Sequence, residues 1–336
     1  MIIRARAPVR ISFAGGGTDV SPYCEEKGGC VVNAAINKYA YATLTTTKDK
    51  VIVESSDFNQ TQEFRNITDI YYNGQLDLLK AVIKHYGKEN IKLFLRSDTP
   101  PRSGLGSSAS AFVAAMGVFE HLKNENSMTN YEIAELAYKL EREELKNYGG
   151  RQDQYAAVFG GINFMEFKGN DFVKISPLKL SKDVLLELEK NLVLVNIGER
   201  RDSGDILIDQ TARYEKGKEK VINAMDRSKE LAIEVKKALI KGDLNRFGNL
   251  LHEAWEEKKK YSKMISNLKI DYLYKIARNA GAIGGKVSGA GGGGHMIFYC
   301  KPNTEQLVSK TLEAAGCRVV SFSFDTNGLQ SWEIRK

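Results

Sequence analysis

Strand-like and helix-like runs alternate through the first third of the chain. Residues 2–13 predict a strand with a break at Pro8, because proline lacks the N–H that a regular ladder needs. Apolar positions at helical spacing predict a helix over residues 70–86 and another that begins near Ala109. Further strands are expected at residues 31–47 (as one strand or two), 50–55 and 91–96. This order of elements indicates a mixed α and β region.

A second helix is predicted over residues 129–146, where Thr129 and Glu132 form the pattern of a capping box. Its apolar phase places Glu141 on the inward side and Glu143 on the solvent side. The helix stops at a double glycine, and Asp153 follows soon after, ahead of a strand expected at residues 162–167. Buried carboxylates are rare unless paired or metal-bound, so Glu141 and Asp153 are candidate site residues. A surface charge for Glu141 and a helix cap or turn for Asp153 are the plain alternatives.

The composition changes near residues 176–183, which suggests a domain boundary. Beyond it we expect a buried strand at residues 192–197 and four amphipathic helices, at about 203–214, 218–240, 244–261 and 270–280. A glycine-rich loop at residues 284–295 then precedes a strand at 296–299, a helix at 304–315 and a strand at 318–324. Because 336 residues exceed one comfortable core, we expect an α+β protein with two domains, residues 1–180 and 181–336.

Composition narrows the classes of function. The formal net charge is +7, but the basic residues are scattered and form no tail, which favours a small anionic ligand over a nucleic acid. No apolar run is long enough to span a membrane and no signal segment is visible, so a cytoplasmic protein that does not associate with membranes is expected. The four cysteines form no CxxC pair, which favours buried, reduced thiols over zinc ligands or disulfides.

The glycine- and serine-rich loop at residues 100–110 lies between a predicted strand and a predicted helix. Glycines let the backbone approach a ligand closely, and the free N–H groups at the start of a helix favour an anion. A phosphate cradle is therefore expected, with a plain turn and serine N-caps as the alternative. The chain has no Walker A sequence. Residues 100–103 (Pro-Pro-Arg-Ser) stand between the strand and the first glycine, which argues against a dinucleotide-binding loop.

Two more glycine-rich segments accompany this loop, so that three occur in order: residues 7–19 (APVRISFAGGGTD), 101–109 (PRSGLGSSA) and 286–294 (KVSGAGGGG). Together they span nearly the whole chain. In order and spacing they resemble the three motifs of the GHMP kinases, the superfamily of galactokinase, homoserine kinase, mevalonate kinase and phosphomevalonate kinase. The resemblance implies an N-terminal domain of the ribosomal protein S5 domain 2-like type and a C-terminal ferredoxin-like domain, with ATP and a sugar in the cleft between them.

The resemblance also assigns roles residue by residue. The family's ATP loop matches Arg102, Ser103, Gly104, Leu105, Gly106, Ser107 and Ser108. Its magnesium ligands match Ser108 and Glu141, so ATP and Mg²⁺ are the implied cofactors. Its catalytic aspartate matches Asp153, with Arg10 steadying the charge that develops. Its substrate-binding residues match Arg10, Gly16, Gly17, Thr18, Asp19 and Asp153. For Asp19, the N-cap of the short helix expected near Pro22 is an alternative.

The exact motif sequences narrow the expected substrate. Galactokinase has Gly-Glu-His-Thr-Asp where residues 15–19 read Gly-Gly-Gly-Thr-Asp, which argues against galactose. Residues 14–19, 149–154 and 198–203 resemble a branch that holds D-glycero-D-manno-heptose 7-phosphate kinases and bacterial fucokinase-like enzymes. This implies an ATP-dependent sugar kinase that phosphorylates the anomeric hydroxyl of the heptose 7-phosphate to the 1,7-bisphosphate, for nucleotide-activated heptose and surface polysaccharide. A fucokinase- or galactokinase-like sugar 1-kinase and a catalytically inactive sensor of sugar and ATP are the alternatives.

The implied partners are thus ATP and a small sugar phosphate, with a homodimer as an open alternative to a monomer. Four basic residues are candidates for binding the sugar's own phosphate, with a solvated surface position as the alternative for each: Lys286, Arg151, Arg200 and Arg201. His252 and His295 are expected to be structural.

Overall fold

Two long antiparallel strands, β1 (Ile2–Ala14) and β2 (Gly29–Thr46), form the centre of the larger sheet. The computed structural model describes residues 1–123, 127–198 and 203–334. The predicted break at Pro8 is wrong: β1 continues through it, and only the register with β2 shifts between Pro8 and Val9. Such a bulge accommodates the missing N–H without ending the strand.

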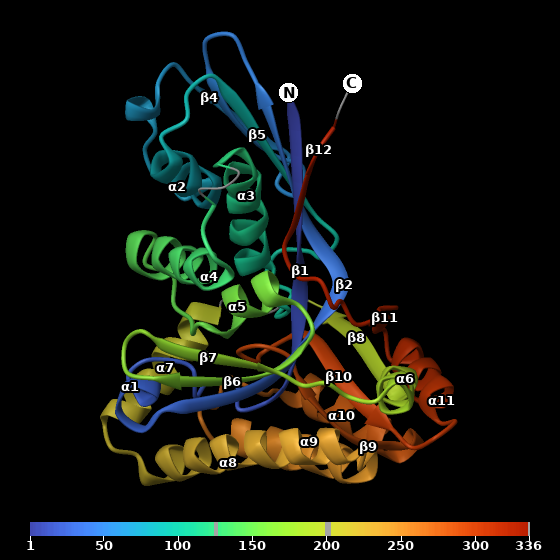
Figure 1. Cartoon of the computed structure of the whole chain (residues 1–336). Coiled ribbons are helices and arrows are strands. Elements are labelled where there is room, and N and C mark those ends of the chain that lie inside the picture. Colours follow the sequence, from blue (N-terminus) through green and yellow to red (C-terminus); the bar gives the residue numbers. More distant parts are fainter. Residues whose placement is uncertain (124–126, 199–202, 335–336) are drawn as a thin grey trace.

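The larger sheet is mixed. Its main path runs β12-β1-β2-β5-β3-β4, with β5 (Ile91–Ser97), β3 (Val51–Ser55) and β4 (Gln60–Phe64) beyond the second half of β2. The first half of β2 pairs instead with β6 (Ile162–Lys168), which pairs with β7 (Phe172–Pro177). The last strand, β12 (Gln330–Glu333), returns to the edge of β1, where it pairs with residues 3–6 (Figure 1).

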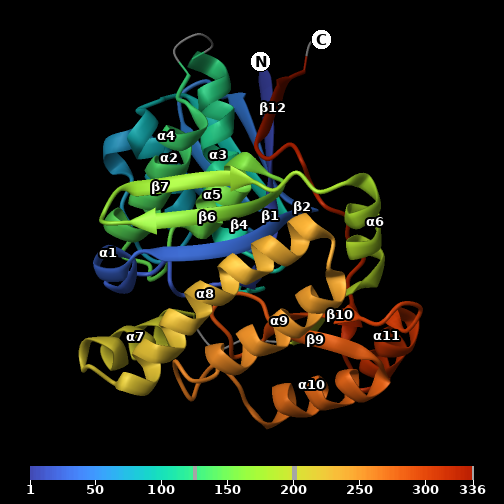
Figure 2. The ribbon, with the colours of Figure 1, turned by 60° about the horizontal axis from the view of Figure 1, so that its bottom comes forward.

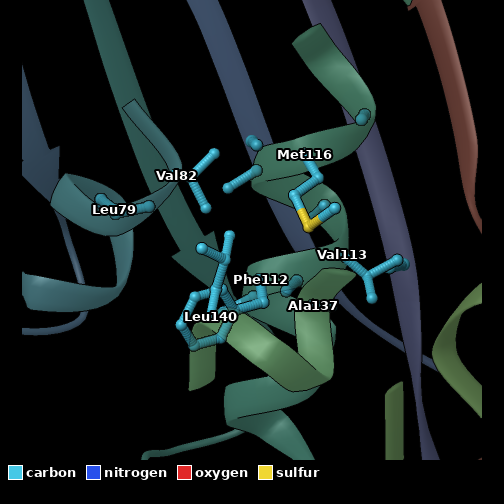
Figure 3. Packing of buried hydrophobic residues seen from close by; sticks show 14 of the residues in the cluster. Leu79, Val82, Phe112, Val113, Met116, Ala137 and Leu140 are labelled. Atoms are coloured by element: carbon cyan, nitrogen blue, oxygen red, sulfur yellow. The ribbon is translucent and has the colours of Figure 1, made fainter. Parts of the chain in front are cut away.

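Helices cover one face of this sheet. They are α2 (Asp77–Tyr86), α3 (Ser107–Lys123), α4 (Asn130–Lys139) and α5 (Gln152–Phe159). Figure 3 shows Val82 of α2 and Leu140, just beyond α4, pointing toward Phe112 of α3. Residues 109–120 of α3 are all buried, so this helix is enclosed on every side. The helix after the 100–110 loop is therefore a rigid core element, and the loop at its start is well anchored.

Two predicted helices differ in their limits. The predicted helix over residues 70–86 begins only at Asp77, because Gly74 and Leu76 both adopt left-handed backbone angles. The predicted helix over residues 129–146 is an α-helix only to Lys139, and residues 140–144 form a π-helical turn. Its capping box is confirmed, since Thr129 and Glu132 exchange the two expected hydrogen bonds. Upstream, the short helix α1 (Tyr23–Lys27) follows the first glycine loop.

The smaller sheet has the order β11-β8-β10-β9 and is antiparallel throughout. Its strands are β8 (Leu192–Gly198), β9 (Ala282–Val287), β10 (Gly294–Cys300) and β11 (Arg318–Val319). The accompanying helices are α6 (Lys182–Asn191), α7 (Ser203–Glu215), α8 (Glu219–Lys241), α9 (Leu244–Lys258), α10 (Leu268–Ala280) and α11 (Glu305–Ala314). Figure 2 shows α8 passing beside β2 of the larger sheet, with α9 beside α8.

A shared hydrophobic core joins the two sheets. Phe13 of β1 packs edge-on against Phe247 of α9, and Phe247 in turn packs against Tyr299 of β10. The division proposed at residues 180 and 181 falls between β7 and α6. The mixed α+β character is confirmed by the two sheets and their helices. All four cysteines are buried and free. Within the described ranges, no helix has both the length and the apolar character needed to cross a bilayer.

Candidate active site

Two adjoining cavities lie where the glycine-rich loops meet. The smaller, of about 200 Å³, is lined by the first glycine-rich loop, the 102–109 loop, residues 148–150, Gln152, Asp153 and Lys258. The larger, of about 730 Å³, extends along α2 and β5. They share the following residues: Arg102, Ser107, Ser108, Glu141, Arg142, Tyr148 and Ser203. The 102–108 loop therefore lies between the smaller cavity and the larger one.

Arg10 and Asp153 form an ion pair in the lining of the smaller cavity. Arg10 Nε and Nη2 both contact Asp153 Oδ1, at 2.8 and 2.7 Å, and the Arg10 side chain is only 4% exposed. Arg10 Nη1 also donates to the carbonyl of Gly104 at 2.8 Å. Arg10 comes from β1 and Asp153 from the first turn of α5, 143 residues later. One guanidinium thus fixes both a carboxylate and the backbone of the 102–108 loop.

The 102–108 loop is held from both sheets. Leu105 O accepts a hydrogen bond from the backbone N–H of Arg10 at 2.9 Å, and His295 Nδ1 of β10 lies 2.8 Å from Ser103 O. Gly294 allows this contact, because a Cβ there would lie 2.4 Å from Ser103 O. Burial lowers the pKa of His295, which suits a neutral, structural ring. The third glycine-rich segment therefore supports the loop at the start of α3.

Asp19 is a buried residue in the lining of the smaller cavity. It is 3% exposed, and its carboxylate accepts hydrogen bonds from the backbone N–H of Gly17, at 3.0 Å, and from the backbone and side-chain amide of Gln152. Burial raises the pKa of Asp19, and the charge of Asp153 adds to this. Asp19 is not the N-cap of α1, whose cap is Pro22. Gly150 leaves room for it, because a Cβ there would lie 2.1 Å from Asp19 Oδ2.

Glu141 and Ser108 both line the two cavities. Glu141 is 2% exposed, as the helix phase indicates, while Glu143 is exposed. The π-helical turn carries Glu141, whose Oε2 accepts from Gln154 Nε2 at 2.7 Å. The described part of the chain holds no group of three or more His, Cys, Asp or Glu side chains arranged for a metal. One carboxylate and one hydroxyl nevertheless fit Mg²⁺, which usually takes its remaining ligands from phosphates and water.

Two buried lysines complete the surroundings of Asp19. Lys258 Nζ donates to Gly16 O at 3.0 Å, and Lys286 Nζ donates to Ser12 O at 3.0 Å. Burial lowers the pKa of Lys258 to about 8, partly offset by Asp19. Burial and the nearby charges of Lys258 and Arg10 lower the pKa of Lys286 to about 7. Sequence reasoning missed Lys258 and the supporting Gln152, although the inward phase of Lys258 on α9 was a usable signal.

The four candidates for binding the sugar's own phosphate fall into two groups. The surface alternative is wrong for Arg151 and Lys286, since both are buried. Arg151 contacts Glu135 at 3.3 Å and stacks over Tyr138, so its charge is already engaged. Arg200 and Arg201 lie outside the described residues.

Comparisons with known proteins show the family to which the chain is similar. Residues 75–161 match the family described as GHMP kinases N terminal domain, and residues 235–317 match GHMP kinases C terminal. D-glycero-alpha-D-manno-heptose 7-phosphate kinase of Campylobacter jejuni subsp. jejuni serotype O:2 is 38% identical over 339 residues, covering 99% of each chain. A crystal structure described as a D-glycero-D-manno-heptose 1-phosphate kinase from Bacteroides thetaiotaomicron is 35% identical, with a TM-score of 0.83 over 99% of this chain and 100% of that one.

A solved structure with lower sequence identity has a similar fold. Lactococcus lactis galactokinase complexed with galactose has a TM-score of 0.77 at 21% identity, over 99% of this chain and 95% of that one, which establishes the fold alone. The two-domain fold that the three motifs imply is confirmed by these matches. The chain therefore belongs to the GHMP kinase family and is a sugar kinase with the two-domain fold of that family.

Proposed function

We propose that this protein transfers the γ-phosphoryl group of ATP to the anomeric hydroxyl of D-glycero-D-manno-heptose 7-phosphate. The observation that carries the proposal is the Arg10–Asp153 pair, which lies between the 102–108 loop and the first glycine loop. A relative that is 38% identical over its full length is named a heptose 7-phosphate kinase. The product would be the 1,7-bisphosphate, a precursor for nucleotide-activated heptose and surface polysaccharide. ATP and sugar phosphates are metabolites of the cytoplasm, so we propose that location.

The ATP phosphates are assigned to the 102–108 loop. Its backbone N–H groups and the start of α3 form a cradle for anions, and the larger cavity beyond it has room for the nucleoside. Mg²⁺, held by Ser108 and Glu141, would neutralise charge on the phosphates. Arg102 lines both cavities and is a candidate phosphate ligand.

The sugar is assigned to the smaller cavity, against Gly16, Gly17, Thr18 and Asp19. In the proposed step, the anomeric oxygen forms the new bond to phosphorus as the bond from phosphorus to ADP breaks. Asp153 accepts the hydroxyl proton. Because both contacts of Arg10 fall on Asp153 Oδ1, Oδ2 is the oxygen that receives it. Before the transfer, Arg10 neutralises the negative charge of the Asp153 carboxylate. During the transfer it stabilises the charge that develops near Gly104.

A panel of sugars tests the proposal through ADP release. It contains heptose 7-phosphate, heptose 1-phosphate, unphosphorylated heptose, fucose and galactose. We expect kcat/KM for heptose 7-phosphate to exceed that for each other sugar by at least about 100-fold, because a polar site rejects analogues that leave its groups unpaired. Preference for heptose 1-phosphate would contradict the proposal, since its anomeric oxygen is already phosphorylated. Binding of sugar and ATP without ADP release in every case would indicate a sensor instead.

A further inference from the structure

Lys258 is a charged side chain in an unusual place. It is 5% exposed, at the end of α9, yet it lines the smaller cavity. Its ammonium donates to Gly16 O at 3.0 Å and to Gln210 Oε1 at 3.4 Å, and it lies 4.6 Å from the centre of the Tyr261 ring. None of these partners carries a negative charge. Burying an ammonium whose hydrogen-bond partners are all neutral is costly, and the nearby charge of Asp19 offsets this only in part, so an apolar side chain would serve the packing of α9 better.

Gln210 of α7 completes the arrangement. It is 1% exposed, and its Nε2 donates to Gly17 O at 3.3 Å while its Oε1 accepts from Lys258. Two consecutive carbonyls of the first glycine loop are therefore held by two side chains that also bind each other. A Cβ at Gly17 would lie 2.7 Å from Lys258 Nζ and 3.2 Å from Gln210 Nε2, so only glycine leaves space for both.

This pair fixes the loop that carries Asp19. The Gly16 carbonyl is held by Lys258 of α9, and the Gly17 carbonyl is held by Gln210 of α7. In this orientation of the loop, the backbone N–H of Gly17 donates to Asp19 Oδ1. Helix α7 also contributes Ser203 and Leu207 to the lining of the same cavity. Lys258 and Gln210 thus connect the first glycine loop with α7, and both of these elements line the smaller cavity, to which the sugar is assigned.

We propose that Lys258 and Gln210 are positioning residues for the sugar, which hold the 15–19 loop and α7 in the geometry that binds it. The assignment to the sugar rests on the proposed function, whereas the effect on the loop does not. If the pair acts this way, its loss weakens sugar binding while leaving ATP binding intact. A residue needed only for folding would affect both substrates alike.

The variants for the test are Lys258→Met, Gln210→Leu, the double variant, and Lys259→Met as the control. Lys259 is the next residue, contacts Glu256 and is 30% exposed. We expect each single variant to raise the KM for the sugar at least about tenfold, because a hydrogen bond to a charged group or a buried carbonyl is lost. The KM for ATP should stay within about twofold, and the double variant should lie within about threefold of the worse single one, because the pair acts as a unit. The control should match the wild type.

Amide hydrogen exchange in the ligand-free protein gives a second measurement that requires no substrate. Residues 15–19 should exchange faster in Lys258→Met and Gln210→Leu, and at the wild-type rate in Lys259→Met. Wild-type exchange in both variants, or an equal rise in both KM values, would overturn the proposal. Should Lys258→Met fail to fold, Gln210→Leu alone decides it by the same measurements. If the wild type does not use the heptose phosphate, the function proposal fails, but the exchange result still decides whether the pair holds the loop.

Discussion

Replacing Arg10 by lysine tests how the site is assembled. The guanidinium makes three contacts of 2.7 to 2.8 Å, two to Asp153 Oδ1 and one to Gly104 O. A lysine ammonium is a single point of charge on a flexible stem and cannot reproduce this planar fork. Arg10→Lys therefore retains the charge but must give up the carboxylate or the carbonyl.

The size of the effect follows from the contacts. A hydrogen bond between a charged group and its partner contributes about 1.5–3 kcal/mol, which corresponds to roughly a 10- to 150-fold loss of kcat for Arg10→Lys. Arg10→Met also leaves Asp153 without its partner. Removing one member of a buried ion pair costs about 3–5 kcal/mol. Because Asp153 is 20% exposed, we expect the lower part of that range, about a 10²- to 10³-fold loss.

The assay is ADP release at saturating ATP and sugar, with Arg96→Lys as the control. Arg96 also contacts an aspartate, Asp98, at 3.2 Å, but it is 49% exposed and a surface pair of this kind contributes little. The control should therefore keep the wild-type kcat. Turnover of Arg10→Lys within about threefold of the wild type would refute the reasoning, because it would show that the fork geometry is not needed.

Three further predictions concern neighbouring residues. Asp153→Asn should keep the fold and ATP binding, measured by thermal unfolding and nucleotide titration, but lose about 10²- to 10⁴-fold in kcat, and near-normal turnover would remove Asp153 from the proton-accepting role. Glu141→Gln should raise the Mg²⁺ concentration that gives half-maximal velocity, and an unchanged Mg²⁺ dependence would exclude Glu141 as a ligand. Burial lowers the pKa of Lys258 to about 8, so above this pH the unfolded chain binds more protons here and the free energy of unfolding rises with pH. Lys258→Met should lose up to about 1.4 kcal/mol per pH unit of that rise in urea titrations between about pH 8 and 10, while Lys259→Met should retain it.

Local sequence patterns predicted the elements that carry the site better than the contacts within it. Helical phase placed Glu141 inward, and it is buried. The π-helical turn that carries Glu141 was not predicted, because the apolar spacing of residues 129–146 is that of an ordinary α-helix. Strands β4 and β12 were missed because both are short, largely polar edge strands without an apolar alternation.

Long-range pairings set the limit of sequence reasoning. Nothing local relates Arg10 to Asp153, 143 residues apart, and only the resemblance of the motifs put both in one site. Lys258 was missed for a different reason, although its position on the helix was a usable signal. Its spacing on α9 pointed inward, but a lysine in that phase is ordinarily expected to extend its charge into solvent. Its burial depends on the carbonyls of a loop more than 240 residues earlier in the chain, at Gly16.

The most direct test of the central claim is the position of the new phosphate in the product. Proton–phosphorus correlation NMR of the reaction with heptose 7-phosphate and ATP locates it without reference to kinetics. We predict a new phosphorus signal that correlates with the anomeric proton, alongside the retained signal of the 7-phosphate. A new phosphate that correlates with any other sugar proton would contradict the assignment of the anomeric hydroxyl to Asp153 and Arg10.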